Sequence, residues 1–309
     1  MMRLIGFVAV TALLGVVPAG TSPATGISYD EVVALKVSMG GDASNLQPGD
    51  FDSDFQTASQ PKPPPMPGAN FPAAGRGMAA VMVATRHYID WPKERVDEPA
   101  RQTASITDCS ARTLTFLDLK NKTYAIGAMP MRPPTETENL HKVSLALTNR
   151  ALGPRNIASI PTDGYQSNVA MGAPNGIYVG GRSVKYGGPS NMALTVYLAK
   201  MPQVPIVHLT CGRDVSLADF WSLIGFGETA YLMRALNGAD PHFTVSNSGP
   251  ALPNRFSMLT LILFTWTKNS QGSSGQGASS AVTLQRAHVA AIRSDDAIFQ
   301  VPADFTKRL

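Results

Sequence analysis

The segment from Ile106 to Ile126 constrains the fold more than any other part of this sequence. Its large apolar residues come in two pairs at a spacing of two, the period of a β-strand, and a polar loop separates the pairs. The pairs are Leu114 with Phe116 and Tyr124 with Ile126. In the loop, Asn121 tolerates the left-handed backbone of a tight turn. We therefore predict a β-hairpin with one apolar face, and residues 103–107 as a neighbouring strand that extends it into an antiparallel meander.

Strand-like segments recur along the rest of the chain, rich in β-branched residues and partly alternating between apolar and polar side chains. The segments that we predict as strands are residues 27–39, 78–90, 141–152, 192–200, 204–209, 254–268 and 281–293. The run from Met258 to Trp266 is almost wholly apolar, which favours a strand buried on both faces. The pattern as a whole predicts a mainly β protein.

The N-terminus has the features of a secretory signal peptide. Arg3 supplies a positive start, residues 4–17 are mostly apolar, and Val17-Pro18-Ala19 fits the small-residue pattern of a cleavage site. The apolar run is shorter than the roughly 20 residues of a membrane-spanning helix. We therefore expect residues 1–19 to be removed and residues 20–309 to form a single β-rich domain, periplasmic or secreted, without a transmembrane segment.

Two stretches differ from the strand pattern. Residues 40–77 are dominated by proline, glycine and small polar residues, so we predict a disordered loop between two strands. Residues 214–239 have helical spacing, and Gly238 is a natural C-terminal stop, so we predict a helical insert there. Its apolar stripe comprises Phe220, Trp221 and Ile224. These side chains either complete the core or line a site for a hydrophobic ligand.

The two cysteines, Cys109 and Cys211, either form one disulfide or remain buried thiols. Export to an oxidising compartment favours the disulfide. Closing a loop of this length would constrain the unfolded chain by roughly 4–5 kcal/mol in the loop-entropy description. We therefore predict a bridge between the two.

The order of several short motifs resembles a family of bacterial exported proteins of unknown function. The motifs are Tyr88-Ile89-Asp90-Trp91 before Arg95, Asp108 with Leu117-Asp118 and Lys122-Thr123-Tyr124, Ile157 with Ile160-Pro161 and Gly164-Tyr165, and the closing Phe299-Gln300-Val301-Pro302. That family is similar in outline to the LolA/LolB-type lipoprotein carriers. The resemblance implies a curved antiparallel sheet or half-barrel, covered on its concave face by a short helical insert. The family ends in Pro-x-Gly-Tyr, whereas this chain has Pro302-Ala303-Asp304-Phe305 and lacks the glycine.

The sequence contains no motif that specifies a catalytic, metal or cofactor site. The five histidines lack zinc-site spacing, and only His208 with Cys211 forms a close pair, for which no third ligand is evident. Neither Gly-x-Ser-x-Gly nor a cysteine-protease motif occurs. The net charge of +4 comes from dispersed basic residues, which argues against nucleic acid as a partner. We therefore assign no catalytic residue, metal or cofactor.

Three functional hypotheses remain open from the sequence. The first is an exported, non-enzymatic module of the cell envelope that binds a lipid, another hydrophobic ligand or a partner protein. The second is a hydrolase whose site is assembled from distant segments and leaves no motif. The third is a purely structural component of the envelope with a filled interior.

Overall fold

The computed structural model describes residues 26–39, 46–61, 78–129, 142–172, 177–179, 182–184, 191–202, 242–253, 255–266, 278–292 and 296–308. In chain order the strands are β1 (Gly26–Met39), β2 (Met78–Asp90), β3 (Lys93–Glu98), β4 (Thr103–Asp108), β5 (Thr113–Asp118), β6 (Thr123–Ala128), β7 (Lys142–Ile157), β8 (Ile160–Gly172), β9 (Ile177–Val179), β10 (Arg182–Val184), β11 (Asn191–Pro202), β12 (His242–Ser248), β13 (Arg255–Trp266), β14 (Ala278–Ile292) and β15 (Thr306–Lys307). The helical elements are α1 (Phe51–Ser59), η2 (Pro99–Arg101) and η3 (Asp296–Phe299).

Most of the described strands form one 13-stranded sheet, in the order β12-β7-β8-β11-β13-β14-β1-β2-β3-β4-β5-β6-β15. The two edge pairings, β12 with β7 and β15 with β6, are parallel. The other pairings within this sheet are antiparallel. The predicted mainly β, antiparallel fold is therefore confirmed, and β9 and β10 make a separate hairpin.

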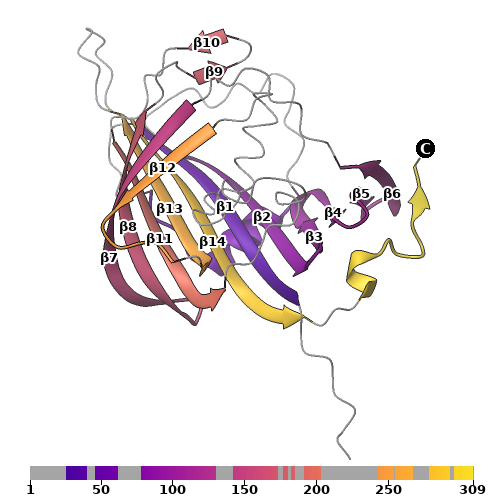
Figure 1. The fold of residues 1–309 in the computed structure, drawn as a ribbon. Coiled ribbons are helices and arrows are strands. Elements are labelled where there is room, and N and C mark those ends of the chain that lie inside the picture. Colours follow the sequence, from indigo (N-terminus) through magenta and orange to yellow (C-terminus); the bar gives the residue numbers. More distant parts are fainter. Residues whose placement is uncertain are drawn as a thin grey trace, which may run out of the picture.

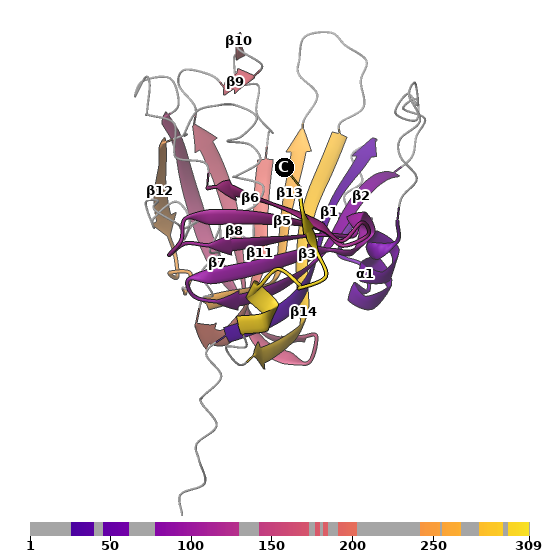
Figure 2. The same ribbon diagram turned by 90° about the vertical axis from the view of Figure 1, so that its right-hand side faces the viewer.

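The sheet bends back on itself and stays open (Figures 1 and 2). The meander β3–β6 lies across from β7, β8 and β11, and the long strands β13, β14, β1 and β2 connect the two sides. The sheet therefore has an inner face, enclosed by the bend, and an outer face. Because side chains alternate along a strand, the strand register assigns each residue to one of the two.

The C-terminal segment and α1 cover the outer face. In Figure 1 the C-terminal segment lies beyond the meander, on the side away from β7 and β8. There Phe299 packs against Ile106 and Leu117, which are both buried. Helix α1 packs on β1 and β2, where Phe51 and Phe55 contact a second buried cluster. That cluster comprises Val32, Ala58 and Ala84.

Helix α1 corrects part of the prediction for residues 40–77. We expected a disordered loop there, but residues 46–61 are folded and Leu46 is fully buried. The helix begins after Asp50, whose side chain caps it by accepting a hydrogen bond from the backbone N–H of Ser53. Phe51 and Phe55 are four residues apart and therefore lie on one side of the helix.

Several other predicted segments lie outside the described residues. They are the remainder of the 40–77 loop, the signal peptide at 1–19, the strand at 204–209 and the helical insert at 214–239. For these segments the expectations from the sequence stay predictions.

The β5–β6 hairpin has the predicted strands but not the predicted single apolar face. Leu117 pairs with Tyr124 and Phe116 pairs with Ala125, so Phe116 and Tyr124 point to opposite faces. The left-handed residue of the turn is Lys122, at φ 51°, and not Asn121. Asn121 instead donates backbone and side-chain hydrogen bonds to Asp118. The β7–β8 turn falls at Ala158 and Ser159, which are both at positive φ.

A buried apolar cluster fills one end of the space inside the bend. It joins Tyr29 and Ile89 of β1 and β2 to Phe256 and Met258 of β13. Residues from the turns at both sides of the sheet pack against it, and these are Cys109, Ile157 and Ile160. Since the cluster connects strands far apart in the sheet order, it holds the bend closed at this end.

Candidate functional site

The inner face changes character along β1 and β2, starting from the closed end. On β1 the inner side chains are Ile27, Tyr29, Glu31, Val33 and Leu35. The first two belong to the apolar cluster and Glu31 is buried, whereas Val33 is half-buried and Leu35 is 43% exposed. On β2 the corresponding residues are Ile89, His87, Thr85 and Val83, and only Val83 is exposed. The inner face is therefore packed at one end and open at the other.

A network of buried charged groups lies just beyond the apolar cluster. Nε of Arg286 on β14 donates to Oε2 of Glu31 at 2.8 Å. On the other side of Glu31, His87 lies between two carboxylates, with Nδ1 3.2 Å from Glu94 and Nε2 3.8 Å from Glu31. The side chains of these four residues are 0–3% exposed. Such burial is tolerated because each charge faces an opposite or hydrogen-bonding group.

Aromatic rings enclose this network. The ring of Tyr29 stacks on His87 with centroids 4.7 Å apart and planes 6° apart. The guanidinium of Arg286 lies 5.1 Å from the centre of the Tyr29 ring and 4.8 Å from that of Phe256. Arg286 also donates to the carbonyl oxygen of Ser257 on β13. The network thus ties together strands β13, β14, β1, β2 and β3, and no part of it is open to a substrate in this conformation.

Three large hydrophobic side chains remain exposed on the inner face among the described residues. They are Leu35 at 43%, Val83 at 47% and Phe116 at 56% exposed. Val83 pairs with the half-buried Val33, and Leu35 is the next inner residue along β1. Val33, Leu35 and Val83 therefore form one patch. Phe116 lies on the meander, in the row that runs from His87 through Val96 and Ser105. Exposed apolar groups on a concave face are typical of a ligand site.

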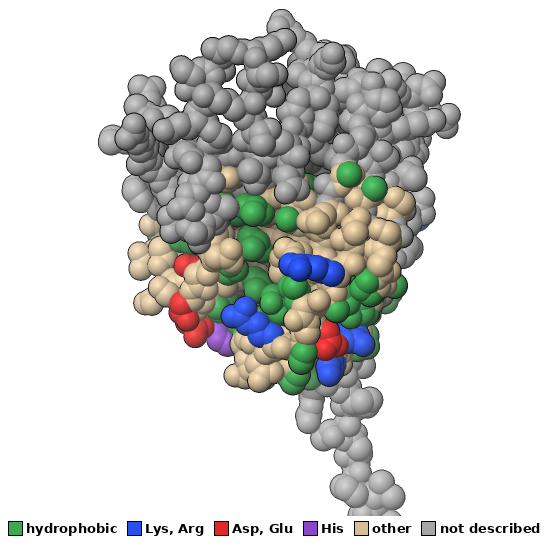
Figure 3. Space-filling model, turned by 90° about the vertical axis from the view of Figure 1, so that its left-hand side faces the viewer, with side chains coloured by type: hydrophobic (Ala, Val, Ile, Leu, Met, Phe, Trp, Pro, Cys, Tyr) green, Lys and Arg blue, Asp and Glu red, His purple; other side chains and the backbone are tan. Residues whose placement is uncertain are grey.

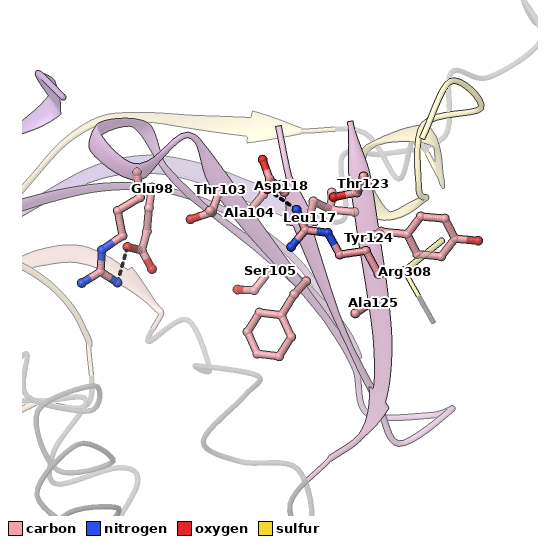
Figure 4. Close-up of a pocket in the computed structure, with 12 residues that line it drawn as sticks. Glu98, Thr103, Ala104, Ser105, Leu117, Asp118, Thr123, Tyr124, Ala125 and Arg308 are labelled. Carbon is pink, nitrogen blue, oxygen red and sulfur yellow. Dashed lines mark hydrogen bonds and ion pairs between the residues drawn. The ribbon is translucent and has the colours of Figure 1, made fainter. Parts of the chain in front are cut away.

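A pocket of about 370 Å³ hollows the meander beside Phe116. Its lining includes Ser105 and Ala125, which point to the same side of the strands in Figure 4, whereas Tyr124 points to the other side. Two ion pairs flank it, Arg101 with Glu98 at 3.0 Å and Arg308 with Asp118 at 2.7 Å. Hydrogen bonds from Asn121, together with Arg308, lower the pKa of Asp118. The pocket therefore combines an apolar floor with charged ends.

Hydrophobic side chains also gather on the side of the molecule shown in Figure 3. The outer faces of β11 and β13 carry Tyr197, Leu261 and Leu263, which are only half-buried. Arg155 lies 5.6 Å from the centre of the Tyr197 ring. This outer patch is less exposed than the inner one, so it is the weaker candidate for a ligand site.

A second charged cluster lies on the outer face, between the sheet and α1. Arg86 donates to Asp30 through Nε at 2.5 Å and Nη2 at 2.9 Å. His288 sits at a β-bulge between β1 and β14 with φ 53°. This conformation brings its Nδ1 to 2.9 Å from Asp30 and its Nε2 to 3.3 Å from Asp52 of α1. The cluster therefore connects α1 to the sheet.

The Asp30 carboxyl makes a testable contribution to stability. Burial by itself would raise its pKa, but the hydrogen bonds and charges of Arg86 and His288 outweigh burial and hold the pKa below its usual value. A lowered pKa stabilises the fold above the unfolded value of 3.8, and the effect is lost as the pH falls through the folded value. We expect Asp30→Asn to lower the free energy of unfolding by about 1.5–3 kcal/mol at pH 7.

The measurement is urea unfolding of both proteins at pH 7 and at steps down to pH 2. The difference between them should shrink as the pH drops below the range in which free aspartate is ionised. A difference that stays constant down to pH 2 would contradict the assignment, because it would mean that the charge of Asp30 is not what stabilises the fold.

The residues predicted as a site from the sequence are not among those that the structure describes, with one exception. Phe220, Trp221 and Ile224 lie outside the described residues, as do His208 and Cys211. Cys109 is disulfide-bonded, and its predicted pairing with Cys211 stays a prediction. Within the described ranges, no helix has the length and apolar character needed to cross a membrane, and no His, Cys, Asp or Glu cluster suits a metal ion.

Comparison with known proteins adds no family to this chain. No protein-family model matches the sequence, and no curated protein matches it either. The function of the chain is therefore inferred from the geometry of the inner face.

Proposed function

We propose that this chain is an exported β-rich protein of the cell envelope, periplasmic or secreted, that holds a hydrophobic ligand against the open end of its inner face. The observation that supports this function is the exposure of Leu35 and Val83 on the inner face of a bent sheet. Single exposed hydrophobic residues are common on soluble proteins, whereas a contiguous exposed apolar patch marks a ligand or partner site.

The layers beneath the patch favour a binding role over a filled interior. The apolar cluster around Phe256 and the network around Arg286 already hold the bend, so the open end is not needed to close it. A patch of aliphatic side chains supported by a rigid floor keeps its shape in the absence of ligand. Such preorganisation lowers the entropy that a ligand loses on binding.

The chemistry of the inner face suits a molecule with an apolar body. Leu35, Val83 and Val33 offer aliphatic contact, and Phe116 with its pocket offers an aromatic surface flanked by ion pairs. A lipid-like amphiphile matches this combination. A lipid-like ligand would also suit the proposed likeness to lipoprotein carriers of the LolA/LolB type.

The test is titration of the purified protein with N-phenyl-1-naphthylamine, whose fluorescence rises in apolar sites. We expect saturable binding, competed by phospholipid, and a dissociation constant about tenfold higher for the double variant Leu35→Gln/Val83→Thr. The estimate corresponds to losing roughly half of the burial energy of two aliphatic side chains, since each is about half exposed.

The matched control is Leu152→Gln on β7, since Leu152 is 41% exposed and outside this patch. The control should bind the probe as the unmodified protein does. Equal affinities in all three proteins would contradict the assignment of the site, and absence of saturable binding would contradict the function.

A further inference from the structure

The outer strand of the meander is β6, which β15 covers only at Thr123 and Tyr124. We propose that an extended peptide segment of a partner protein adds to β6 along Ala125–Ala128 as a further strand and places an apolar side chain in the adjoining pocket. This inference is argued from the backbone groups of β6 and does not depend on the proposed lipid-like ligand.

The hydrogen-bond pattern shows which backbone groups of β6 are available. Met129 donates to the carbonyl of Arg112, so the odd-numbered residues of β6 face β5. On the opposite edge, Arg308 donates to the carbonyl of Tyr124, so the even-numbered residues face outward. Strand β15 pairs only with Thr123 and Tyr124. Among the described residues, none pairs with the outward N–H and C=O groups of Ile126 and Ala128.

The side chains along this edge do not block pairing with another strand. Residues 125–128 are alanine, isoleucine, glycine and alanine, and all four are exposed. Edge strands normally carry lysine, proline or a bulge that blocks further pairing. None of these devices occurs in this four-residue edge, whose backbone is therefore open to another strand.

The backbone groups define the chemistry of the occupant. Only an extended polypeptide presents N–H and C=O groups at the repeat of about 6.8 Å that successive outward residues require. A small-molecule ligand would leave these groups to water. The edge has room for roughly four residues of a peptide between β15 and the end of β6.

The pocket defines one side chain of that peptide. Ala125 faces the pocket beside Phe116, and Gly127 is the next residue on the same face. A Cβ built on Gly127 would meet only the Leu114 carbonyl oxygen, at 4.0 Å. A strand added to β6 would therefore find space beside both small residues, and a large apolar side chain would reach the ring of Phe116.

The test uses a fluorescein-labelled, uncharged peptide of eight residues with capped ends, in which threonine alternates with leucine or phenylalanine. Anisotropy titration should show saturable binding. Ile126→Pro removes the outward N–H without touching the ladder to β5 and should weaken binding about tenfold. Ile126→Thr keeps the N–H and should weaken binding less than about threefold.

A peptide with N-methyl groups on alternate amides tests the same bonds with the unmodified protein, so the result does not depend on the proline variant folding. It should bind about tenfold more weakly than its parent. Peptide binding that survives both Ile126→Pro and N-methylation would overturn the proposal, as would absence of saturable binding. A concentration-dependent dimer whose Ile126 amide is protected from exchange would also overturn it, because a second copy would then occupy the edge.

The two proposed sites meet only at the pocket beside Phe116, and Ile126→Pro changes neither this pocket nor the patch of Val33, Leu35 and Val83. The variant Ile126→Pro should therefore bind N-phenyl-1-naphthylamine normally. Conversely, Leu35→Gln/Val83→Thr should bind the peptide normally, which separates failure of this proposal from failure of the proposed function.

Discussion

Replacing Arg286 with methionine should lower the free energy of unfolding by about 3–5 kcal/mol. The guanidinium is the cation that balances Glu31, and both side chains are almost completely buried. Its loss leaves the carboxylate of Glu31, which lies beside His87, without its arginine. An uncompensated charge in a low-dielectric interior costs far more than the methionine gains by packing.

The measurement is urea unfolding followed by intrinsic fluorescence and far-ultraviolet circular dichroism. Arg86→Met is the matched control, since Arg86 pairs with Asp30 on the outer face but is 48% exposed. We expect a clearly smaller loss for the control, because the Asp30 carboxylate that remains keeps its contact with His288 at 2.9 Å. Equal losses, or a loss below about 1 kcal/mol for Arg286→Met, would contradict the role of the network.

Replacing Phe256 with alanine should also cost about 3–5 kcal/mol. Phe256 is 1% exposed and packs in the cluster that closes the bend. Its ring meets Tyr29 edge-on, with centroids 5.1 Å apart, and lies beside Arg286. Alanine would leave a cavity at the junction of the apolar cluster and the charged network, so both would lose contacts.

The control for this variant is Phe256→Leu, which keeps most of the volume and should cost less than about 1.5 kcal/mol. The same urea experiment compares the two. If alanine and leucine destabilise to the same extent, the ring does not fill the closed end in the way described, and the site is more open than the structure indicates.

The strands were predictable because the period of two is a local property. β1, β2, β11, β13 and β14 all appear close to their expected ranges, and the meander pairs in the expected order. Each of these segments is rich in apolar and β-branched residues over the length of a strand, and this signal is present in the local sequence.

The register of the β5–β6 hairpin was not predictable from the same pattern. Two apolar pairs at spacing two fit either face, and the number of loop residues decides which side chains meet. The structure pairs Asp118 with Thr123, which places Tyr124 outside and Phe116 inside. The exposed Phe116 of the candidate site follows directly from this register.

The charged network was also not apparent in the sequence. Glu31 and Arg286 are separated by 255 residues, and no spacing rule connects them. The available signal was the presence of charged or titratable residues within predicted strands, since Glu31 lies in β1 and His87 and Arg286 lie in β2 and β14. Helix α1 was missed for a different reason, because its two phenylalanines lie among the small polar residues typical of disorder.

Native mass spectrometry of the protein purified from its host tests the central claim most directly. We expect a population with a bound mass that organic solvent extracts, and we expect Leu35→Gln/Val83→Thr to lose it while Leu152→Gln retains it. A spectrum that contains only the bare chain, for the unmodified protein as for the variants, would contradict a ligand on the inner face.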